Sequence, residues 1–404
     1  MAKRPAASKR LSADNLARLG AERLGELMFE MSGDDAIWKR RLRMELAAEV
    51  GAPDLAAEID KRLTSVAASR ARVSWRKRPE VIRDLRTLLH MIHDRLAALD
   101  LGLAAQRLLD WFALYPGLAA RVKDPKGELL ALFESAAQSL WETLDTAHES
   151  GLAAAAFTAT AMARRPGDWA RWLDAGGTAV GPALAAAILA LLRAEGPPSG
   201  APMRLIVLRL ADLSGDVDVW LETLPTTHRH LPEIGAQIAL RLLGAGRIEA
   251  ARQALEAARP RPAADGRRWG ARRPAPAPAA APDWELADIA VLEAEGRMDE
   301  AQAARWAVFE RDLSADALRD YLARLDDFED VAALERAFAH AATYPRVLPA
   351  LAFLMEWPAL REAADLVAAR SAELPATAPA MSDWARILEA RHPEAAEILL
   401  RRPK

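Results

Sequence analysis

The sequence predicts an all-α protein, built as a right-handed stack of antiparallel helical hairpins (an α-solenoid) with little or no strand. Three observations lead to this prediction. Ala and Leu, both strong helix formers, dominate the apolar residues. Apolar residues recur with the helical period along almost the whole chain. One phrase also occurs twice, as GRIEAARQALEAA at 246–258 and as GRMDEAQAARWAV at 296–308.

The composition limits the classes of function. The chain has 404 residues, of which 51% are hydrophobic, a balance typical of soluble globular proteins. It contains no cysteine, which excludes disulfides, thiolate metal sites and cysteine nucleophiles. The N-terminal stretch MAKRPAASKRLSADN has no apolar core, so it does not resemble a secretory signal peptide. The apolar stretch 177–192 is too short to span a membrane. We therefore expect a cytoplasmic protein with no membrane partner.

The first helices are expected before residue 100. An Asp of DDAIWKRRLRMELAAEV caps one helix, which ends at Gly51, and Pro53 begins the next. Pro79 and Glu80 open a further helix, because Pro suits the first turn and an acid complements the helix dipole there. The apolar stripe of this helix consists of Leu85, Leu88, Leu89, Ile92, Leu96 and Leu99.

Five tryptophans follow one another at intervals of 30–37 residues, without a shared consensus around them. We interpret them as large side chains that fill gaps between helices. They are Trp38, Trp75, Trp111, Trp141 and Trp172.

The two repeated phrases are each interpreted as helix, Gly-Arg turn, helix. Gly246 and Gly296 are expected to end the first helix of each pair, where a positive φ costs glycine little. Alanines in the second helices allow close packing. These are features of tetratricopeptide-like hairpins. The expected stripes are Ile248, Ala251, Leu255 and Ala258 in one copy and Met298, Ala301, Ala304 and Val308 in the other.

The segment RPRPAADGRRWGARRPAPAPAAAPD separates the two copies. Its six prolines and six arginines cannot build a packed core, so we expect a flexible basic loop. The matching hairpins on either side suggest that one stack continues across it. The predicted organisation is a disordered basic tail at 1–11, a helical array at 12–258, the Pro/Arg-rich loop at 259–283 and a tetratricopeptide-like array at 284–404.

Charge is spread unevenly along the chain. Residues 1–86 hold 19 bases and 13 acids, whereas residues 284–342 hold 15 acids and 6 bases. Basic residues surround an aromatic side chain in RARVSWRKRPEVIR, and WKRRLR adds further cations including Arg40. Such a set is able to hold phosphates and stack a base; the alternative is a solvated connector with its Trp tucked against a neighbour. The candidate interaction patch is Arg41, Arg43, Arg72, Trp75, Arg76, Lys77 and Arg78.

Other polar clusters are better explained by structural roles than by metal binding or catalysis. His90 and His93 lie one helical turn apart, but Arg86 on the same flank opposes a metal ion. The acids of DDFED, at 326–330, complement the N-terminus of the following helix. There is no phosphate-binding glycine loop, Rossmann fingerprint or His-Glu-x-x-His motif. We expect no catalytic residue, no metal and no cofactor.

Several stretches resemble an uncharacterised family of bacterial helical proteins known only as a domain of unknown function. They include LGAERLGELMFEMSGDDAIWKRRLRMELA, WRKRPEVIRDLRTLL and IAVLEAEGRMDEAQAARWAVFERDLSADALRDYLARL, with ALAFLMEWPALREAADLVAAR near the end. The resemblance spans nearly the whole chain. It implies an all-helical, repeat-like fold and brings no activity, cofactor or catalytic residue with it. The Pro/Arg-rich insertion is longer than in similar proteins.

The sequence favours a non-enzymatic scaffold or adaptor that binds another protein, because helical repeats present long concave surfaces. The alternative is a nucleic-acid-associated protein that uses the basic N-terminal region and the Arg-rich loop. A third hypothesis is an enzyme whose active site matches no known sequence motif. Self-association is a further possibility, since the basic and acidic regions of the chain complement each other.

Overall fold

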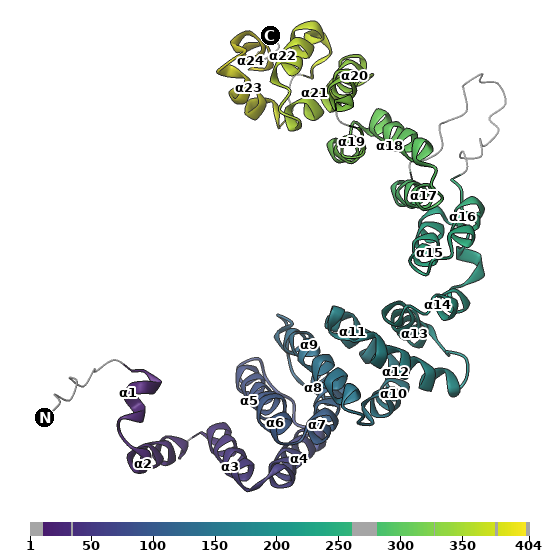
Figure 1. The fold of residues 1–404 in the computed structure, drawn as a ribbon. Helices are drawn as coiled ribbons and strands as arrows, with labels where there is room; N and C mark the ends of the chain where they lie inside the picture. Colours follow the sequence, from purple (N-terminus) through teal and green to yellow (C-terminus); the bar gives the residue numbers. More distant parts are fainter. Residues whose placement is uncertain (1–10, 34, 261–280, 327, 376–378, 401–404) are drawn as a thin grey trace, which may run out of the picture. The chain divides into compact units, whose positions relative to one another are not determined.

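The computed structural model describes residues 11–33, 35–260, 281–326, 328–375 and 379–400 (Figure 1). This part of the chain is helical, as predicted. Its only β-type pairing is an isolated parallel bridge between Val73 and Val122, so the expectation of little or no strand is confirmed there. No helix in the same ranges is long and apolar enough to cross a membrane.

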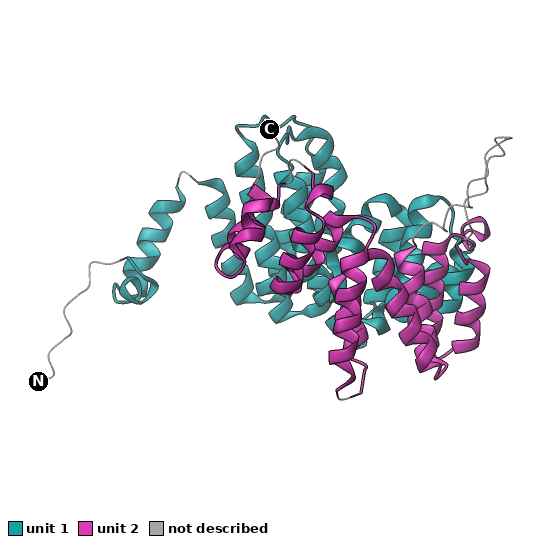
Figure 2. Ribbon diagram, turned by 90° about the horizontal axis from the view of Figure 1, so that it is seen from above, with its two compact units in different colours: residues 1–224 teal, residues 225–404 magenta. Residues whose placement is uncertain are grey.

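The chain divides into two compact units, residues 1–224 and 225–404 (Figure 2). The division falls between Leu224 and Pro225, so the predicted Pro/Arg-rich loop at 259–283 belongs to the second unit. Residues 261–280 of that loop, and residues 1–10 of the predicted tail, lie outside the described residues.

The first unit consists of helices that follow one another through short connections. Its elements are α1 (Ala13–Ala17), α2 (Ala21–Ser32), α3 (Ala36–Val50), α4 (Ala52–Ala68), α5 (Arg78–His90), the π-helical η1 (Met91–Leu96), α6 (Ala97–Leu99), α7 (Leu101–Ala113), α8 (Tyr115–Arg121), α9 (Glu128–Glu149), α10 (Ala154–Arg164), α11 (Pro166–Gly176), the 3-10 turn η2 (Gly177–Ala179), α12 (Pro182–Ala194), α13 (Ala201–Ser214) and α14 (Val217–Thr223).

The second unit is built in the same way. Its elements are the 3-10 turn η3 (Thr226–His228), α15 (Pro232–Gly244), α16 (Ile248–Ala257), α17 (Pro282–Ala294), α18 (Met298–Asp312), α19 (Ala315–Leu322), α20 (Glu329–Thr343), α21 (Val347–Glu356), α22 (Leu360–Ala369), the 3-10 turn η4 (Ser371–Glu373), α23 (Met381–Glu389) and α24 (Pro393–Leu400).

The predicted ends of the early helices are correct. Asp35 caps α3 by accepting hydrogen bonds from the amides of Ile37 and Trp38, and α3 ends at Gly51. The hydrogen bond to Trp38 is the largest influence on this carboxyl and lowers the pKa of Asp35. Pro53 lies in the first turn of α4.

The two Gly-Arg turns have the same structure. Gly246 and Gly296 have φ of 72° and 76°. In one turn the Arg247 amide donates to the Leu242 carbonyl at 2.8 Å, and in the other the Arg297 amide donates to the equivalent carbonyl, that of Leu292, at 2.9 Å. Both are Schellman endings, in which glycine supplies the left-handed residue and the freed carbonyls are satisfied. The repeated phrase therefore encodes two equivalent helix–turn–helix units.

Helix α15 packs against both α16 and α17. The α15–α16 contact is close because Gly235 faces Ala258: a Cβ at Gly235 would lie 2.1 Å from the Ala258 Cβ. The expected stripe of α16 is largely confirmed, since Ala251, Leu255 and Ala258 are buried.

Large aromatic side chains fill the interior of the first unit. Trp111, Trp141 and Trp172 are fully buried, as expected for gap-filling side chains. The Trp111 ring is stacked on Phe133, with the ring centroids 4.2 Å apart. The Trp141 indole donates to the Trp172 carbonyl at 2.9 Å, which satisfies its polar edge. Trp75 is different, because 55% of it is exposed.

Two predicted apolar stripes are only partly buried in the structure. Leu99 is exposed, although Leu85 to Leu96 bury one face. The reason is the π-helical segment Met91–Leu96, which changes the number of residues per turn and rotates Leu99 away from that face. In α18 Met298 is exposed, and the buried residues around Ala301 are instead Arg305, Trp306 and Phe309.

Candidate functional site

The connector between α4 and α5, residues 69–77, is fixed against the segment that follows α8. The Val73 amide donates to the Arg121 carbonyl at 2.9 Å, and the Lys123 amide donates to the Val73 carbonyl at 3.0 Å. The Arg121 guanidinium also donates to the carbonyls of Val66 and Ala71, at 3.1 and 3.3 Å. These bonds hold the connector in one conformation and place its cations beside α3 and α4.

A cavity of about 350 Å³ opens beside this connector. Its walls come from α3, α4, the connector, the first turns of α5 and Arg121. The charged residues of the lining are the five cations Arg40, Arg62, Arg72, Lys77 and Arg121 and the two acids Glu80 and Asp84. We call this site the basic pocket.

Two of these cations are bound to one carboxylate. Arg40 donates to Asp84 Oδ1 at 2.6 Å, and the Nε of Arg62 donates to Asp84 Oδ2 at 2.8 Å. Asp84 is buried, so both guanidiniums stabilise a charge that would otherwise be costly to hold there. The Nε of Arg40 is also buried and has no acceptor among the described residues.

The other three cations have no carboxylate partner in the part of the chain that the structure describes. Arg121 bonds to carbonyls and to the Ser69 hydroxyl. Arg72 and Lys77 are exposed and form no ion pair there. Glu80 is exposed at the rim and likewise unpaired. The basic pocket therefore carries an excess of positive charge.

The structure divides the predicted interaction patch. Arg72 and Lys77 line the basic pocket. Trp75 lies next to them in sequence with the Arg76 guanidinium over its ring, 5.2 Å from the centroid. Arg78 is buried and pairs with Glu128 at 3.0 Å, so it serves the fold and is not available to a partner.

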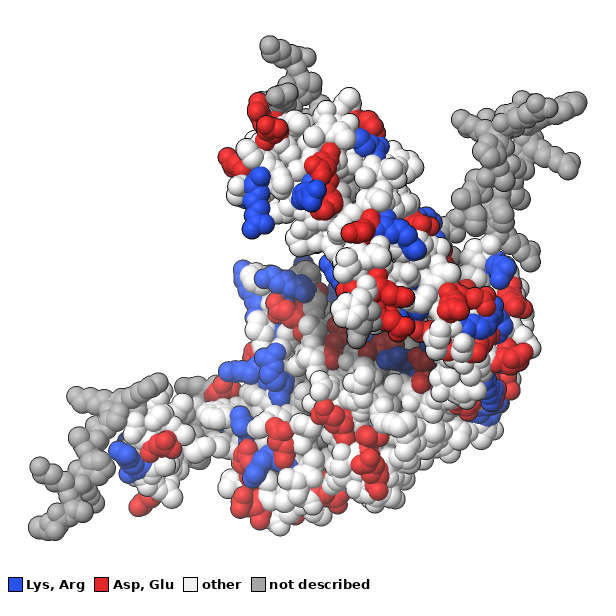
Figure 3. Space-filling view, turned by 45° about the horizontal axis from the view of Figure 1, so that its top comes forward, with Lys and Arg blue, Asp and Glu red and all other residues white. Residues whose placement is uncertain are grey.

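The two residues predicted on α3 lie apart from this pocket. The Arg41 guanidinium is 5.4 Å from the centroid of the Trp38 ring and 3.8 Å from Glu45 Oε1. Arg43 is exposed and makes no ion pair within the described residues. Over the face drawn in Figure 3, acidic and basic side chains are interspersed rather than separated by sign.

Arg62 and Arg121 were not predicted. Neither lies in a basic run: Arg62 is on α4, and Arg121 ends α8, far along the chain from the connector. Only packing of α8 against the connector brings Arg121 to the pocket, and no local pattern in the sequence indicates it.

The two histidines of the predicted pair contact different residues of the chain. His90 pairs with Asp94 in the next turn, and His93 Nδ1 lies 3.2 Å from the Thr143 hydroxyl. The residues that the structure describes contain no group of three or more His, Cys, Asp or Glu suited to a metal ion. At DDFED, Glu329 and Asp330 lie in the first turn of α20, which agrees with the dipole interpretation.

A second cavity, of about 550 Å³, lies in the second unit and is here called the α18–α20 groove. Its apolar and aromatic lining includes Met298, Trp306 and Tyr321. The Arg336 guanidinium sits over the Trp306 ring, 3.3 Å from the centroid. The charged lining residues are Asp299, Arg324, Asp326, Glu329 and Arg336.

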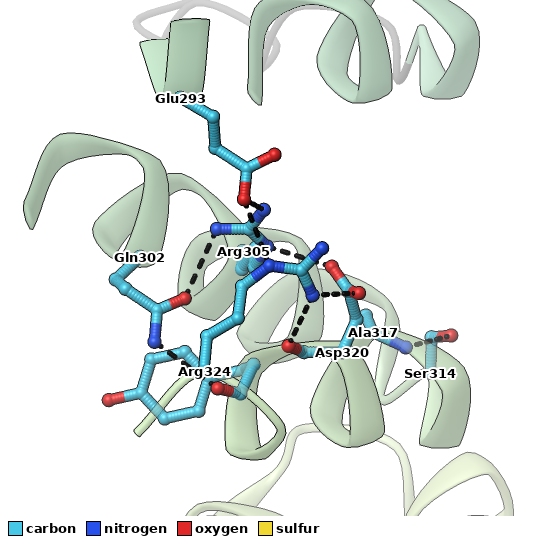
Figure 4. Close-up of polar contacts among 8 residues, drawn as sticks. Glu293, Gln302, Arg305, Ser314, Ala317, Asp320 and Arg324 are labelled. Atoms are coloured by element: carbon cyan, nitrogen blue, oxygen red, sulfur yellow. Dashed lines mark hydrogen bonds and ion pairs between the residues drawn. The ribbon is translucent and has the colours of Figure 1, made fainter. Parts of the chain in front are cut away.

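An ion network centred on one buried arginine supports this groove (Figure 4). Arg305 of α18 is buried and donates to Glu293 of α17 at 2.5 Å and to Asp320 of α19 at 2.7 Å. Arg324 donates to the same two carboxylates, at 2.9 Å for Glu293. Burial acts to raise the pKa of Asp320, but the hydrogen bonds from the two arginines outweigh it and the pKa is lowered.

A third cavity, of about 480 Å³, lies in the first unit beside Phe112 and Trp172. Its charged lining residues are two acids and two bases, namely Asp110, Asp168, Arg164 and Arg165. The positive and negative charges are therefore equal in number and favour neither an anionic nor a cationic ligand.

A protein-family model matches residues 6–195 and 199–402, which together are most of the chain. The model is that of a family of unknown function, DUF6880. The chain belongs to this family. The resemblance predicted from the sequence is thereby confirmed for the family and for its helical character. No curated protein and no solved structure matches this DUF6880 member.

Proposed function

We propose that this DUF6880 member is a non-enzymatic, cytoplasmic helical-repeat protein of the tetratricopeptide-like, right-handed solenoid type, and that it binds another protein through the α18–α20 groove. The observation that carries this proposal is the lining of the groove. Apolar and aromatic surface lies beside three carboxylates, those of Asp299, Asp326 and Glu329, that form no ion pair within the described residues.

The arrangement of helices in the second unit supports the repeat interpretation. Two equivalent Gly-Arg hairpins follow each other, and the first helix of one packs on the first helix of the next. Stacked hairpins of this kind present extended concave surfaces to a partner. Adaptors of this architecture use such surfaces to hold extended segments of other proteins.

The charges of the groove indicate the partner's chemistry. Both cations in the lining are already engaged: Arg324 bonds to Glu293 and Asp320, and Arg336 lies over Trp306. The unpaired carboxylates therefore set the sign of the site, and a Lys or Arg side chain complements them. The exposed Met298 offers an apolar contact. We infer that the groove takes a segment that carries a basic residue next to an apolar one.

Selection from a random peptide library against the full chain tests this proposal. The selected peptides are expected to combine Lys or Arg with an apolar residue, and the double variant Asp299→Asn, Glu329→Gln is expected to bind them about tenfold more weakly. The matched control is Asp365→Asn, Asp383→Asn on α22 and α23, which removes the same charge from exposed residues outside the groove. Peptides without basic residues, or equal losses in the double variant and the control, would contradict the proposal.

The alternative, nucleic-acid binding, rests on one observation. Arg72, Trp75, Arg76 and Lys77 remain exposed in a single connector, where cations and an aromatic ring are available together. Against it, several cations of the same region are bound to carboxylates of this chain, among them Arg40 with Asp84, Arg78 with Glu128 and Arg83 with Asp35. We therefore favour the protein partner.

A further inference from the structure

We propose that the basic pocket of the first unit binds the phosphate group of a small phosphorylated molecule. This site is separate from the α18–α20 groove and does not depend on the function proposed for that groove.

The charge balance of the pocket is the first argument. Arg40 and Arg62 share the single carboxylate of Asp84, which leaves that trio with one positive charge in excess. Arg72, Lys77 and Arg121 contribute three more, and Glu80 at the rim removes one. A concave site with protein walls strengthens the field of uncompensated charges relative to a flat surface. An anion is the ligand that such a field attracts.

The second argument is an unused donor. The Arg40 Nε–H is buried without an acceptor in the described part of the chain, although Arg40 lines the cavity. Buried donors in folded proteins are normally paired. Because this atom is out of contact with solvent, a shift of the Arg40 side chain toward the cavity is needed before an anionic oxygen there can accept its hydrogen bond, an acceptor that no carboxylate or carbonyl of the described residues supplies.

The third argument is rigidity. The bridge between Val73 and Val122 fixes the connector, and Arg121 is held by three groups of residues 66–71. Arg62 is held by Asp84. Because Arg62 and Arg121 are positioned before a ligand arrives, only the exposed Arg72 and Lys77 have to be ordered on binding. This distinguishes the pocket from scattered surface arginines, which remain mobile and well solvated.

The chemistry of the pocket favours a phosphate ester over a carboxylate. A phosphate monoester carries close to two negative charges near neutral pH and three strong acceptor oxygens, which suits several guanidinium groups and a lysine. The cavity of about 350 Å³ also has apolar walls, including Val66, Val73 and Val81, that can contact the organic part of an ester. We expect a small monoester to bind more tightly than inorganic phosphate, and both more tightly than acetate.

The test uses isothermal titration calorimetry of the full chain with phenyl phosphate, inorganic phosphate and acetate at equal ionic strength. The double variant Arg72→Gln, Lys77→Gln is expected to weaken phenyl phosphate binding at least about tenfold, since it removes two charge-assisted contacts. The matched control is Arg43→Gln, Arg70→Gln, which removes the same charge from exposed residues outside the pocket lining. Circular dichroism melting establishes that both variants fold.

Three results would overturn the proposal. The first is absence of phenyl phosphate binding at millimolar concentration. The second is an equal loss in the control, which would make the effect one of general charge. The third is tight binding of an oligonucleotide that depends on Arg72 and Lys77 while the monoester does not bind. That third result would assign the pocket to nucleic acid. A preference for inorganic phosphate over the ester retains the phosphate site but assigns it to the free ion.

Discussion

Arg252 of α16 donates two parallel hydrogen bonds to the carboxylate of Glu295, the residue that follows α17, at 2.8 and 2.9 Å. The same guanidinium reaches Asp288 of α17 at 2.5 Å. Two helices that flank residues 261–280 are thus joined directly by one largely buried side chain.

Replacement of this arginine is expected to destabilise the second unit. Arg252→Ala leaves the two partly buried carboxylates without their main partner, and we expect a loss of about 1–3 kcal/mol in the free energy of unfolding. Urea denaturation measures it. The control Arg386→Ala removes an exposed pair with Asp383 and should cost no more than about 0.5 kcal/mol. A loss for Arg252→Ala as small as the control's would show that the bidentate pair contributes little.

The same contact predicts a pH dependence. The hydrogen bonds from Arg252, with those from Arg297, hold the pKa of Glu295 below its usual value. A carboxylate with a lowered folded pKa stabilises the fold above its unfolded pKa, and that contribution disappears as the pH falls through the folded value. Wild type should therefore exceed Glu295→Gln in stability at pH 7, and the difference should shrink below about pH 4. Urea titrations at pH 7 and pH 3 test this, and an unchanged difference would refute the assignment.

Arg305 anchors the network beneath the α18–α20 groove. Only 3% of its side chain is exposed, and it holds α17 and α19 through Glu293 and Asp320. We expect Arg305→Ala to cost about 1–3 kcal/mol in the free energy of unfolding, since it removes a buried side chain and one of the two arginine partners of these partly exposed carboxylates. Arg305→Met keeps the apolar volume and should cost less. Thermal and urea unfolding compare the two variants; equal losses would mean that packing of the stem is irrelevant.

Three glycines of one hairpin should respond differently to alanine. Gly235→Ala forces a Cβ against Ala258 and should destabilise by about 1–3 kcal/mol. Gly246→Ala places a side chain at positive φ and should cost about 1–2 kcal/mol. Gly244→Ala, with nothing within 4 Å of its Cβ at the end of α15, is the control and should be neutral or stabilising. Circular dichroism melts of the three variants give the order, and a destabilised control would contradict this packing.

Nucleic-acid binding makes a prediction of its own. Because Arg78 is buried, the exposed cations of the connector are Arg70, Arg72, Arg76 and Lys77, so a duplex bound there should show a log–log salt slope of about −3.6. Trp75→Ala should weaken single strands more than duplex. Our preferred function predicts no binding of either at micromolar protein in about 50 mM salt. Fluorescence anisotropy separates the two outcomes.

Features with a local cause were predictable from the sequence. The Asp35 cap, the helix end at Gly51 and the two Gly-Arg turns each depend on a few neighbouring residues, and the structure confirms them. The tryptophans of the core were predictable as gap-filling side chains, although only packing distinguishes the buried Trp111 from the exposed Trp75.

Features that depend on distant residues were not predictable. The basic run 76–78 looks uniform, yet Arg78 turns inward to Glu128 while Lys77 lines a cavity with Arg121. Which cations are neutralised depends on the carboxylates that the fold brings to them, and these lie on other helices. The π-helical segment at Met91–Leu96 likewise has no simple sequence signal, and it displaces Leu99 from the expected stripe.

The contact between Arg252 and Glu295 joins α16 and α17 through side chains, in addition to the peptide connection between them. The Trp284 indole donates to the Leu255 carbonyl at 2.9 Å, and α15 packs directly on α17, so the two sides are matched without a covalent link. Two separately expressed fragments, ending at Pro260 and starting at Ala281, carry complementary surfaces. The segment between them is consequently a natural position for a split reporter, in which reassembly of the halves signals that two fused proteins have met.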